Sequence, residues 1–451
     1  MKRWLVALLT LAAGAANALT ECRVPGLRNS VQCGVVQRPL DPARPAGPVI
    51  DVNYVVVPAM ARRKLPDPVF LLAGGPGQSA IGVGPQVFGL FSRLNNRRDI
   101  VFVDQRGTGR SAPLECPETK HERLSDQAGA ERQIELLMQC KAGLLKLPYI
   151  QAESDLGFFT TTLAMQDLDA VRAQLGAERI DLVGVSYGTR AALEYMRLFP
   201  TRVRRSVLDS VAPPDMVLPA SFSTDSQAAL DALLAACDQQ AACQTSYPRL
   251  RADWAALLAS LPRAVTAAHP LTGQIEHFAL TRDMVLGAVR GALYSSATAA
   301  ALPAAITEAA AGRIEALVGV GALLSSRKGI QLAMGMHFSI VCAEDVPRLD
   351  GASDPPGADF RAEYATLYRR ACARWPRGAV PAAFYSVPAS TTPTLLFSGG
   401  IDPATPPRHG ARIAAALGPA AQHVVVPNAG HSVLGVGCAR DLLYRFIDAA
   451  D

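Results

Sequence analysis

The sequence predicts an α/β protein in which a mostly parallel sheet is flanked by helices and carries an inserted helical cap. Two observations favour this fold. Short apolar runs alternate with helical patterns between residues 49 and 209, as expected of strands joined by crossover helices. After residue 214 the sequence pattern changes, because residues 222–262 and 280–325 are rich in Ala and Leu without a strand run between them. The strand–helix pattern resumes near residue 394, so one α/β unit encloses the insertion.

The elements follow in chain order from short apolar runs and from apolar side chains at helical spacing. The expected strands cover residues 49–58, 69–73, 100–104, 180–185, 203–209, 393–397 and 423–426. The expected helices cover residues 161–175, 190–199 and 439–449. We therefore expect residues 19–215 and 386–451 to form the α/β core. Residues 216–385, between the strand ending near Asp209 and the strand starting near Thr394, are expected to form the cap.

The first 18 residues have the features of a secretory signal peptide. Lys2 and Arg3 precede an apolar run over residues 4–16, and residues 16–18 resemble an Ala-x-Ala cleavage site. The run is shorter than the ~20 residues that span a bilayer, which disfavours the alternative of an uncleaved anchor. We therefore expect a soluble mature protein, periplasmic or secreted, without a membrane partner. Removing Lys2 and Arg3 lowers the net charge from +5 to +3, which is too weak to predict nucleic-acid binding.

Export to an oxidising compartment makes disulfides the expected state of the nine cysteines. Pairing of sequence neighbours suggests the bonds Cys22–Cys33, Cys116–Cys140, Cys237–Cys243 and Cys342–Cys372, and leaves Cys438 free. This connectivity is a hypothesis, because spacing alone does not determine pairing. The sequence has no Cys-x-x-Cys pair and no metal-binding His spacing, so we expect neither a metal nor an organic cofactor.

Residues 184–188, Gly-Val-Ser-Tyr-Gly, match the Gly-x-Ser-x-Gly pattern of a nucleophile elbow. The pattern alone is weak, but here an expected strand leads directly into it and an expected helix leads out. Glycines flank such a serine because the sharp turn leaves no room for side chains, and the helix N-terminus directs free N–H groups to the same place. The alternative is an ordinary strand–helix turn with Ser186 as N-cap. We favour Ser186 as a nucleophile.

A serine hydroxyl needs a base to take its proton, and after an elbow the chain order is Ser, acid, His. His431 fits as the base, because it lies in a small-residue loop between the last expected strand and the last expected helix. His423, inside that strand, and His409, at the start of a helix, are weaker rivals.

Asp402 fits as the acid, because it follows an apolar strand and a glycine turn. There it would hold the imidazole in one tautomer. Asp402 could instead serve only to form the turn before Pro403, and Asp209, which ends an earlier strand, is the alternative acid.

A glycine-rich loop follows the expected strand at residues 69–73. Its residues 74–77, Gly-Gly-Pro-Gly, offer unobstructed backbone N–H groups, which together with the N–H of Tyr187 could form an oxyanion hole. A phosphate-binding loop is the alternative, but no Gly-Lys-Ser/Thr sequence follows.

Several segments are similar to motifs of one enzyme family. They are LAGGPGQS at residues 72–79, VDQRGTG at 103–109, DLDAVR at 167–172, GVSYGT at 184–189, and GIDPATPP at 400–407 with Gly430-His431. Together they resemble the prolyl-aminopeptidase and tripeptidyl-aminopeptidase group of α/β-hydrolases, including its TAP-like C-terminal segment. The resemblance covers most of the mature chain and is least clear over about residues 222–325.

This resemblance implies an α/β-hydrolase fold with a catalytic triad of Ser186, Asp402 and His431. It also implies an oxyanion hole formed by Gly75 and Tyr187. Ala73 stands where the prolyl enzymes carry the His of His-Gly-Gly-Pro-Gly. The departure weakens the expectation of a strict proline preference more than the expectation of catalysis.

Enzymes that remove N-terminal residues need a carboxylate to bind the α-ammonium group of the substrate. Glu344 and Asp345 in the cap are the candidates, through charge-assisted hydrogen bonds. The alternative is that both are helix-end or surface acids.

The sequence therefore predicts an exported serine hydrolase that acts on a small peptide or ester. The favoured function is an aminopeptidase that releases N-terminal residues, of the proline or short tripeptide type, through an acyl-enzyme. A carboxylesterase with the same triad and a non-catalytic binding protein on a hydrolase scaffold are the alternatives.

Overall fold

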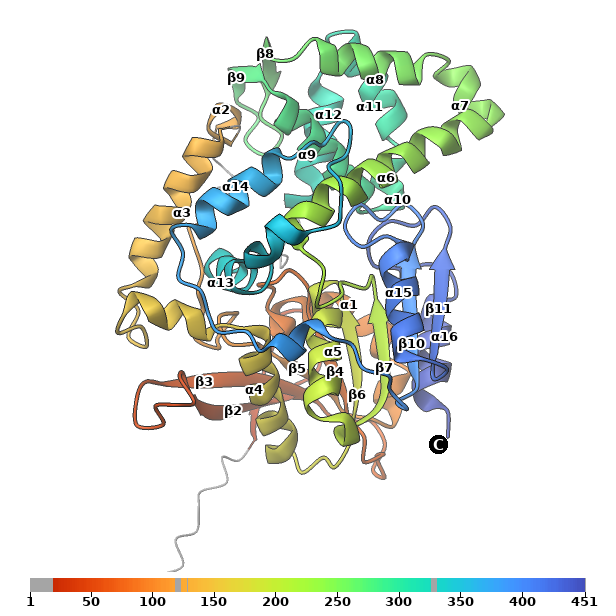
Figure 1. Cartoon of the computed structure of the whole chain (residues 1–451). Coiled ribbons are helices and arrows are strands. Elements are labelled where there is room, and N and C mark those ends of the chain that lie inside the picture. Colours follow the sequence, from red (N-terminus) through yellow and green to blue (C-terminus); the bar gives the residue numbers. More distant parts are fainter. Residues whose placement is uncertain (1–18, 118–122, 128, 326–330, 451) are drawn as a thin grey trace, which may run out of the picture.

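The computed structural model describes residues 19–117, 123–127, 129–325 and 331–450, and the expected signal peptide lies outside them. Its core is a nine-stranded sheet in the order β1-β2-β3-β5-β4-β6-β7-β10-β11, seen in the lower half of Figure 1. The strands are β1 (Thr20–Cys22), β2 (Val31–Pro39), β3 (Val49–Val57), β4 (Val69–Leu72), β5 (Ile100–Val103), β6 (Ile180–Val185), β7 (Val203–Asp209), β10 (Thr394–Gly399) and β11 (Ala421–Val426). From β5 to β11 the neighbours pair in parallel, whereas β1, β2, β3 and β5 pair antiparallel in succession.

Helices cover both faces of this sheet. On one face α4 (Thr161–Gln174), α5 (Tyr187–Leu198) and α15 (Pro407–Leu417) pack against the strands, and on the other α1 (Ala80–Phe91) and α16 (Ala439–Asp448) do so. All residues of β4 and β5 are consequently buried. This double burial explains their continuous apolar sequence and confirms the expected α/β-hydrolase fold class.

The sequence located the central strands to within two residues but missed β1 and β2 at the edge of the sheet. The sequence of β2 contains Gly34 and polar side chains among its valines. Its apolar pattern is therefore weaker than that of a strand buried on both faces.

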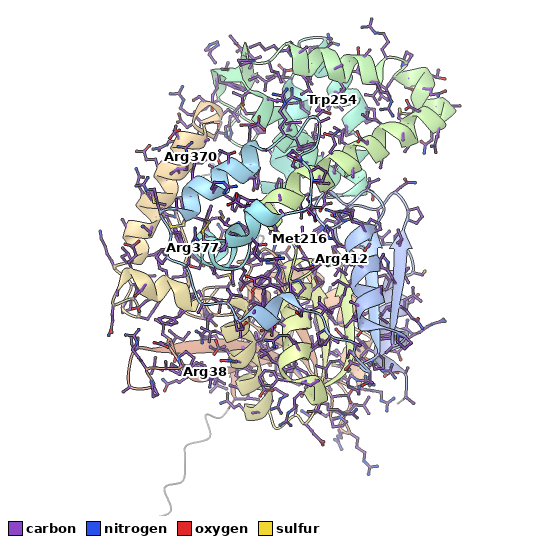
Figure 2. The ribbon with its side chains drawn as sticks, in the orientation of Figure 1. Arg38, Met216, Trp254, Arg370, Arg377 and Arg412 are labelled. Carbon is purple, nitrogen blue, oxygen red and sulfur yellow. A yellow bond between two sulfur atoms is a disulfide. The ribbon has the colours of Figure 1, made fainter. Side chains whose placement is uncertain are left out.

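Between β7 and β10 the chain forms a cap above the sheet. The cap helices are α6 (Leu218–Gln239), α7 (Ala241–Ser246), α8 (Leu250–Ala259), α9 (Arg282–Leu293), α10 (Ser296–Ala299), α11 (Leu302–Ala310), α12 (Glu315–Ser325), α13 (Met334–Glu344) and α14 (Glu363–Cys372). Many of their apolar side chains form a hydrophobic core of the cap's own. In Figure 2, Met216, just before α6, lies at the base of the cap and Trp254 of α8 lies near its top.

Two features on the cap side of the sheet differ from the sequence analysis. A hairpin of β8 (Arg263–Ala268) and β9 (Ile275–Leu280) lies between the helices, where no strand was expected. In β9 only alternate residues are buried, so no continuous apolar run marks it. In addition α3 (Ala130–Leu144), from the N-terminal half, lies beside α14 on the cap side in Figure 1.

The structure confirms the expected pairing of the cysteines. Disulfides join Cys22 to Cys33, Cys116 to Cys140, Cys237 to Cys243 and Cys342 to Cys372, and Cys438 is free and exposed. The last of these bonds ties α13 to α14 inside the cap. None of the helices in the described ranges combines the length and hydropathy that a membrane crossing requires.

Candidate active site

Ser186 lies on the sharp turn between β6 and α5. Its backbone has φ 57° and ψ −125°, a conformation that costs a non-glycine residue on the order of 1–3 kcal/mol. A Cβ added at Gly184 would lie 2.5 Å from the carbonyl oxygen of Gly188, and one at Gly188 would lie 2.0 Å from that of Leu72. The turn therefore requires both glycines, as expected of a nucleophile elbow.

Asp402 and His431 meet at the same edge of the sheet, after β10 and β11. His431 Nδ1 lies 2.8 Å from Oδ2 and 3.0 Å from Oδ1 of Asp402. The Asp402 carboxylate is fully buried and also accepts hydrogen bonds from the N–H groups of Ala404 and Thr405 and from Thr405 Oγ1. Burial raises the pKa of Asp402, but His431 and these backbone donors outweigh it and lower the pKa to about 2. The acid is thus held ionised beside the imidazole.

Asp209, the alternative acid, has a different set of partners. Its buried carboxylate accepts from Ser432 Oγ at 2.8 Å and from the N–H groups of Val433 and Leu434 at 3.0 and 3.1 Å. Its backbone carbonyl accepts from the N–H of Ser186 at 2.9 Å. Asp209 therefore ties the loop that carries His431 to the nucleophile turn, and Asp402 holds the imidazole itself.

The two rival histidines are engaged elsewhere. His409 lies in α15 and places Nε2 2.8 Å from Oδ2 of the buried Asp225. His423 lies in β11 with Nε2 2.9 Å from Ser398 Oγ, and burial lowers its pKa. The first contact joins α15 to α6, and the second joins β11 to β10.

The contacts join Asp402 to His431 and place Ser186 at the same sheet edge. Ser186 and His431 are both partly exposed, and among the described residues no hydrogen bond connects Ser186 Oγ to the imidazole. Such bonds are often long without substrate and shorten when it binds. The complete triad therefore remains a prediction that rests on this shared edge.

The glycine loop after β4 lies directly against the nucleophile. A Cβ at Gly74 would lie 3.2 Å from the Cβ of Ser186. Gly75 has φ 112° and is partly exposed. Tyr187 is the first residue of α5, and its hydroxyl is buried 2.7 Å from Thr161 Oγ1. The loop and the helix start thus flank Ser186, where Gly75 and Tyr187 were expected as oxyanion donors.

The structure places Glu344 and Asp345 at the end of α13 with partners inside the protein. Glu344 is buried and accepts from the N–H and Oγ1 of Thr161 at 2.8 and 2.9 Å. Asp345 is buried in a two-fold contact with Arg190 at 3.0 and 3.1 Å. Both are helix-end acids, as the alternative stated, but neither is a solvated surface acid and neither is open to a substrate ammonium group. Their contacts instead anchor the cap to α4 and α5, so the ammonium-binding role stays a prediction that these partners weaken.

The cap contributes contacts to the histidine loop that the sequence analysis missed. The carbonyl of Tyr294 accepts from the N–H of His431 at 2.9 Å, and the two rings meet edge-on with centroids 4.9 Å apart. Ser296 Oγ donates to the carbonyl of Asn428 at 3.0 Å. These residues follow α9 and lie more than 130 positions from the loop they touch, so no local pattern could reveal them.

Comparisons with known proteins agree with this architecture. Residues 67–247 match the family of the alpha/beta hydrolase fold, and residues 358–450 match the family of TAP-like proteins. The chain is 30% identical to tripeptidyl aminopeptidase of Streptomyces lividans over 196 residues, which are 42% of this chain and 36% of that protein. It is 30% identical to serine protease Hip1 of Mycobacterium tuberculosis over 205 residues, 43% of this chain and 38% of that protein.

A third relative is proline iminopeptidase of Neisseria meningitidis, which is 28% identical over 144 residues, 32% of each chain. The alignments span only about a third of the length of these curated relatives. These matches confirm the resemblance expected from the motifs for the two matched segments, residues 67–247 and 358–450.

Proposed function

Because the chain has the alpha/beta hydrolase fold and a TAP-like segment, we propose that it is an exported serine hydrolase that releases N-terminal residues from short peptides. The observation that carries the proposal is the buried Asp402–His431 pair, with Nδ1 2.8 Å from Oδ2, at the sheet edge where Ser186 occupies the nucleophile elbow. The names of the relatives supply the peptidase part, and the four disulfides favour an oxidising compartment.

In the proposed reaction Ser186 Oγ attacks the substrate carbonyl carbon while His431 Nε2 takes the hydroxyl proton. Asp402 accepts a hydrogen bond from the Nδ1–H and stabilises the imidazolium cation that forms. The N–H groups of Gly75 and Tyr187 would hold the oxyanion of the tetrahedral intermediate. The imidazolium then gives its proton to the leaving amine as the C–N bond breaks. Water, activated by the same imidazole, releases the acyl group and restores the Ser186 hydroxyl.

The decisive experiment compares three substrates on the mature protein. They are a tripeptidyl anilide with a free N-terminus, the same anilide after N-acetylation, and a simple aryl ester. An aminopeptidase should hydrolyse the first and lose activity on the second, whereas an esterase should prefer the ester and ignore acetylation. Hydrolysis of none of them would favour a binding protein.

Ser186→Ala serves as the matched control. The variant should abolish both hydrolysis and labelling by a fluorophosphonate probe, because the probe reacts only with an activated serine. Activity that survives in Ser186→Ala would contradict the proposal.

A further inference from the structure

One cation of the cap lies beside the candidate catalytic histidine. Arg290 is partly buried on α9, one helical turn before Tyr294. Its guanidinium carbon lies 5.0 Å from the centroid of the Tyr294 ring, and that ring lies 4.9 Å from the imidazole of His431. Two successive contacts thus connect Arg290 to the reaction centre.

Arg290 is held in place by neutral groups. Its Nε donates to Ser226 Oγ at 3.1 Å and one terminal nitrogen donates to the hydroxyl of Tyr294 at 2.8 Å. The guanidinium stacks on the ring of Phe222 at 3.1 Å, and Phe222 stacks in turn on Tyr364 at 3.9 Å. These contacts fix the orientation of the side chain. Two of its five N–H groups are used, and no carboxylate pairs with it among the described residues.

Three arginines that are more deeply buried than Arg290 each pair with a carboxylate. Arg106 pairs with Asp167 at 2.7 Å, Arg190 pairs with Asp345 at 3.0 Å, and Arg98 pairs with Asp67 at 2.7 Å. Even partial withdrawal of a cation from water costs free energy when no anion compensates it. Arg290, which borders the reaction centre, is therefore an oriented guanidinium whose remaining donors suit an anion from outside the protein.

We propose that Arg290 is a specificity-determining residue that binds a carboxylate of the substrate. The guanidinium edge matches a carboxylate in geometry and can donate two parallel hydrogen bonds. The inference rests on the proposed function and names its substrate class, which is short peptides that carry a free C-terminal carboxylate or an acidic side chain. Phe222 and Tyr364 supply the aromatic side of the same subsite.

The test measures binding and not turnover, by calorimetry on the Ser186→Ala protein. The probes are Ala-Ala-Ala and its C-terminal amide, and Ala-Glu-Ala-amide and Ala-Gln-Ala-amide. A preference within the first pair identifies the terminal carboxylate as the ligand, and one within the second pair identifies a side chain. We expect the acid to bind about tenfold to a hundredfold more tightly than its neutral partner in one pair, the usual size of a charge-assisted contact.

Adding Arg290→Gln should remove this preference, and Arg290→Lys should retain part of it because the charge remains without the planar donor pair. Arg282→Gln is the matched control on the same helix. Arg282 donates to the backbone carbonyl of Asp359 at 3.1 Å, and its loss should leave the preference unchanged. Equal binding of acid and neutral peptides to the Ser186→Ala protein would overturn the inference. An equal loss for both in Arg290→Gln would do the same, since it would show that Arg290 only shapes the cap.

If none of the four peptides binds, the peptidase proposal fails and the anion site is tested separately. Butyrate and butyramide are then compared as protectors of wild-type Ser186 against the fluorophosphonate probe. Protection by butyrate that depends on Arg290 supports the site without a peptide substrate. Equal protection by both compounds, or protection by neither, would overturn it.

Discussion

Replacing Asp402 with Asn tests which carboxylate serves the candidate triad. Both oxygens of Asp402 lie within 3.0 Å of His431 Nδ1, so in Asp402→Asn the amide nitrogen can donate to Nδ1 and force the proton onto Nε2. That tautomer cannot accept the proton of Ser186. We expect kcat to fall by about four orders of magnitude, as the same change does in a serine protease, which corresponds to about 5 kcal/mol in the activation barrier. The assay is steady-state hydrolysis of the best substrate, with circular dichroism to show that the variant folds.

Asp209→Asn is the matched control for this change. The donors from residues 432 to 434 all reach Oδ2 of Asp209, so an amide with its oxygen at that position keeps these three. The amide nitrogen then replaces Oδ1, which lies 3.4 Å from Ser210 Oγ. Burial already raises the pKa of this carboxyl, and the amide removes its charge. We expect a loss of about 1–2 kcal/mol in the free energy of unfolding and a change in kcat of less than about tenfold. A fall in kcat as large as that of Asp402→Asn would refute our assignment of the acid.

Three further changes test the cap anchor, the cap disulfide and the elbow. Burial raises the pKa of Glu344 from 4.5 to about 7, so the folded state binds this proton more tightly than the unfolded chain does. The stability that protonated Glu344 contributes is complete below pH 4.5. The free energy of unfolding should therefore decline by about 3 kcal/mol as the pH rises to 7. Urea unfolding should show that Glu344→Gln removes this decline, and an unchanged slope would contradict the assignment. Replacing both Cys342 and Cys372 with Ser opens a bond with a sequence separation of 30, and should lower the free energy of unfolding by about 2–4 kcal/mol in urea. An unchanged unfolding midpoint would show that the bond does not stabilise the cap. Gly188→Ala should prevent folding, because its Cβ would lie 2.0 Å from a backbone oxygen, whereas Gly143→Ala meets nothing within 4 Å and should stabilise α3 by about 0.5–1 kcal/mol in thermal unfolding. A soluble, normally melting Gly188→Ala protein would rule out the elbow geometry.

Local features of this protein could be predicted from the sequence. The spacing of residues 184–188 between a strand and a helix predicts the elbow, because a turn that sharp excludes Cβ atoms at fixed positions. The central strands are continuous apolar runs because helices cover both of their faces. The disulfides join cysteines at most 30 positions apart, and pairing of sequence neighbours predicted all four.

The tertiary structure decided which of the polar groups at the sheet edge contact one another. Asp209 ends β7 and Asp402 follows β10, and the carboxyl ends of these neighbouring parallel strands meet at one edge. The sequence favoured Asp402 for its glycine turn but could not give the contacts of either carboxylate. The path of the loop after His431 directs its N–H groups to Asp209 and its imidazole to Asp402. Glu344 and Asp345 were candidates because an aminopeptidase needs a carboxylate to bind the substrate ammonium group, and only packing against Thr161 and Arg190 revealed their buried contacts. A sequence determines which chemical groups are present and their local turns, whereas distances between groups far apart in the chain are set by how whole elements pack.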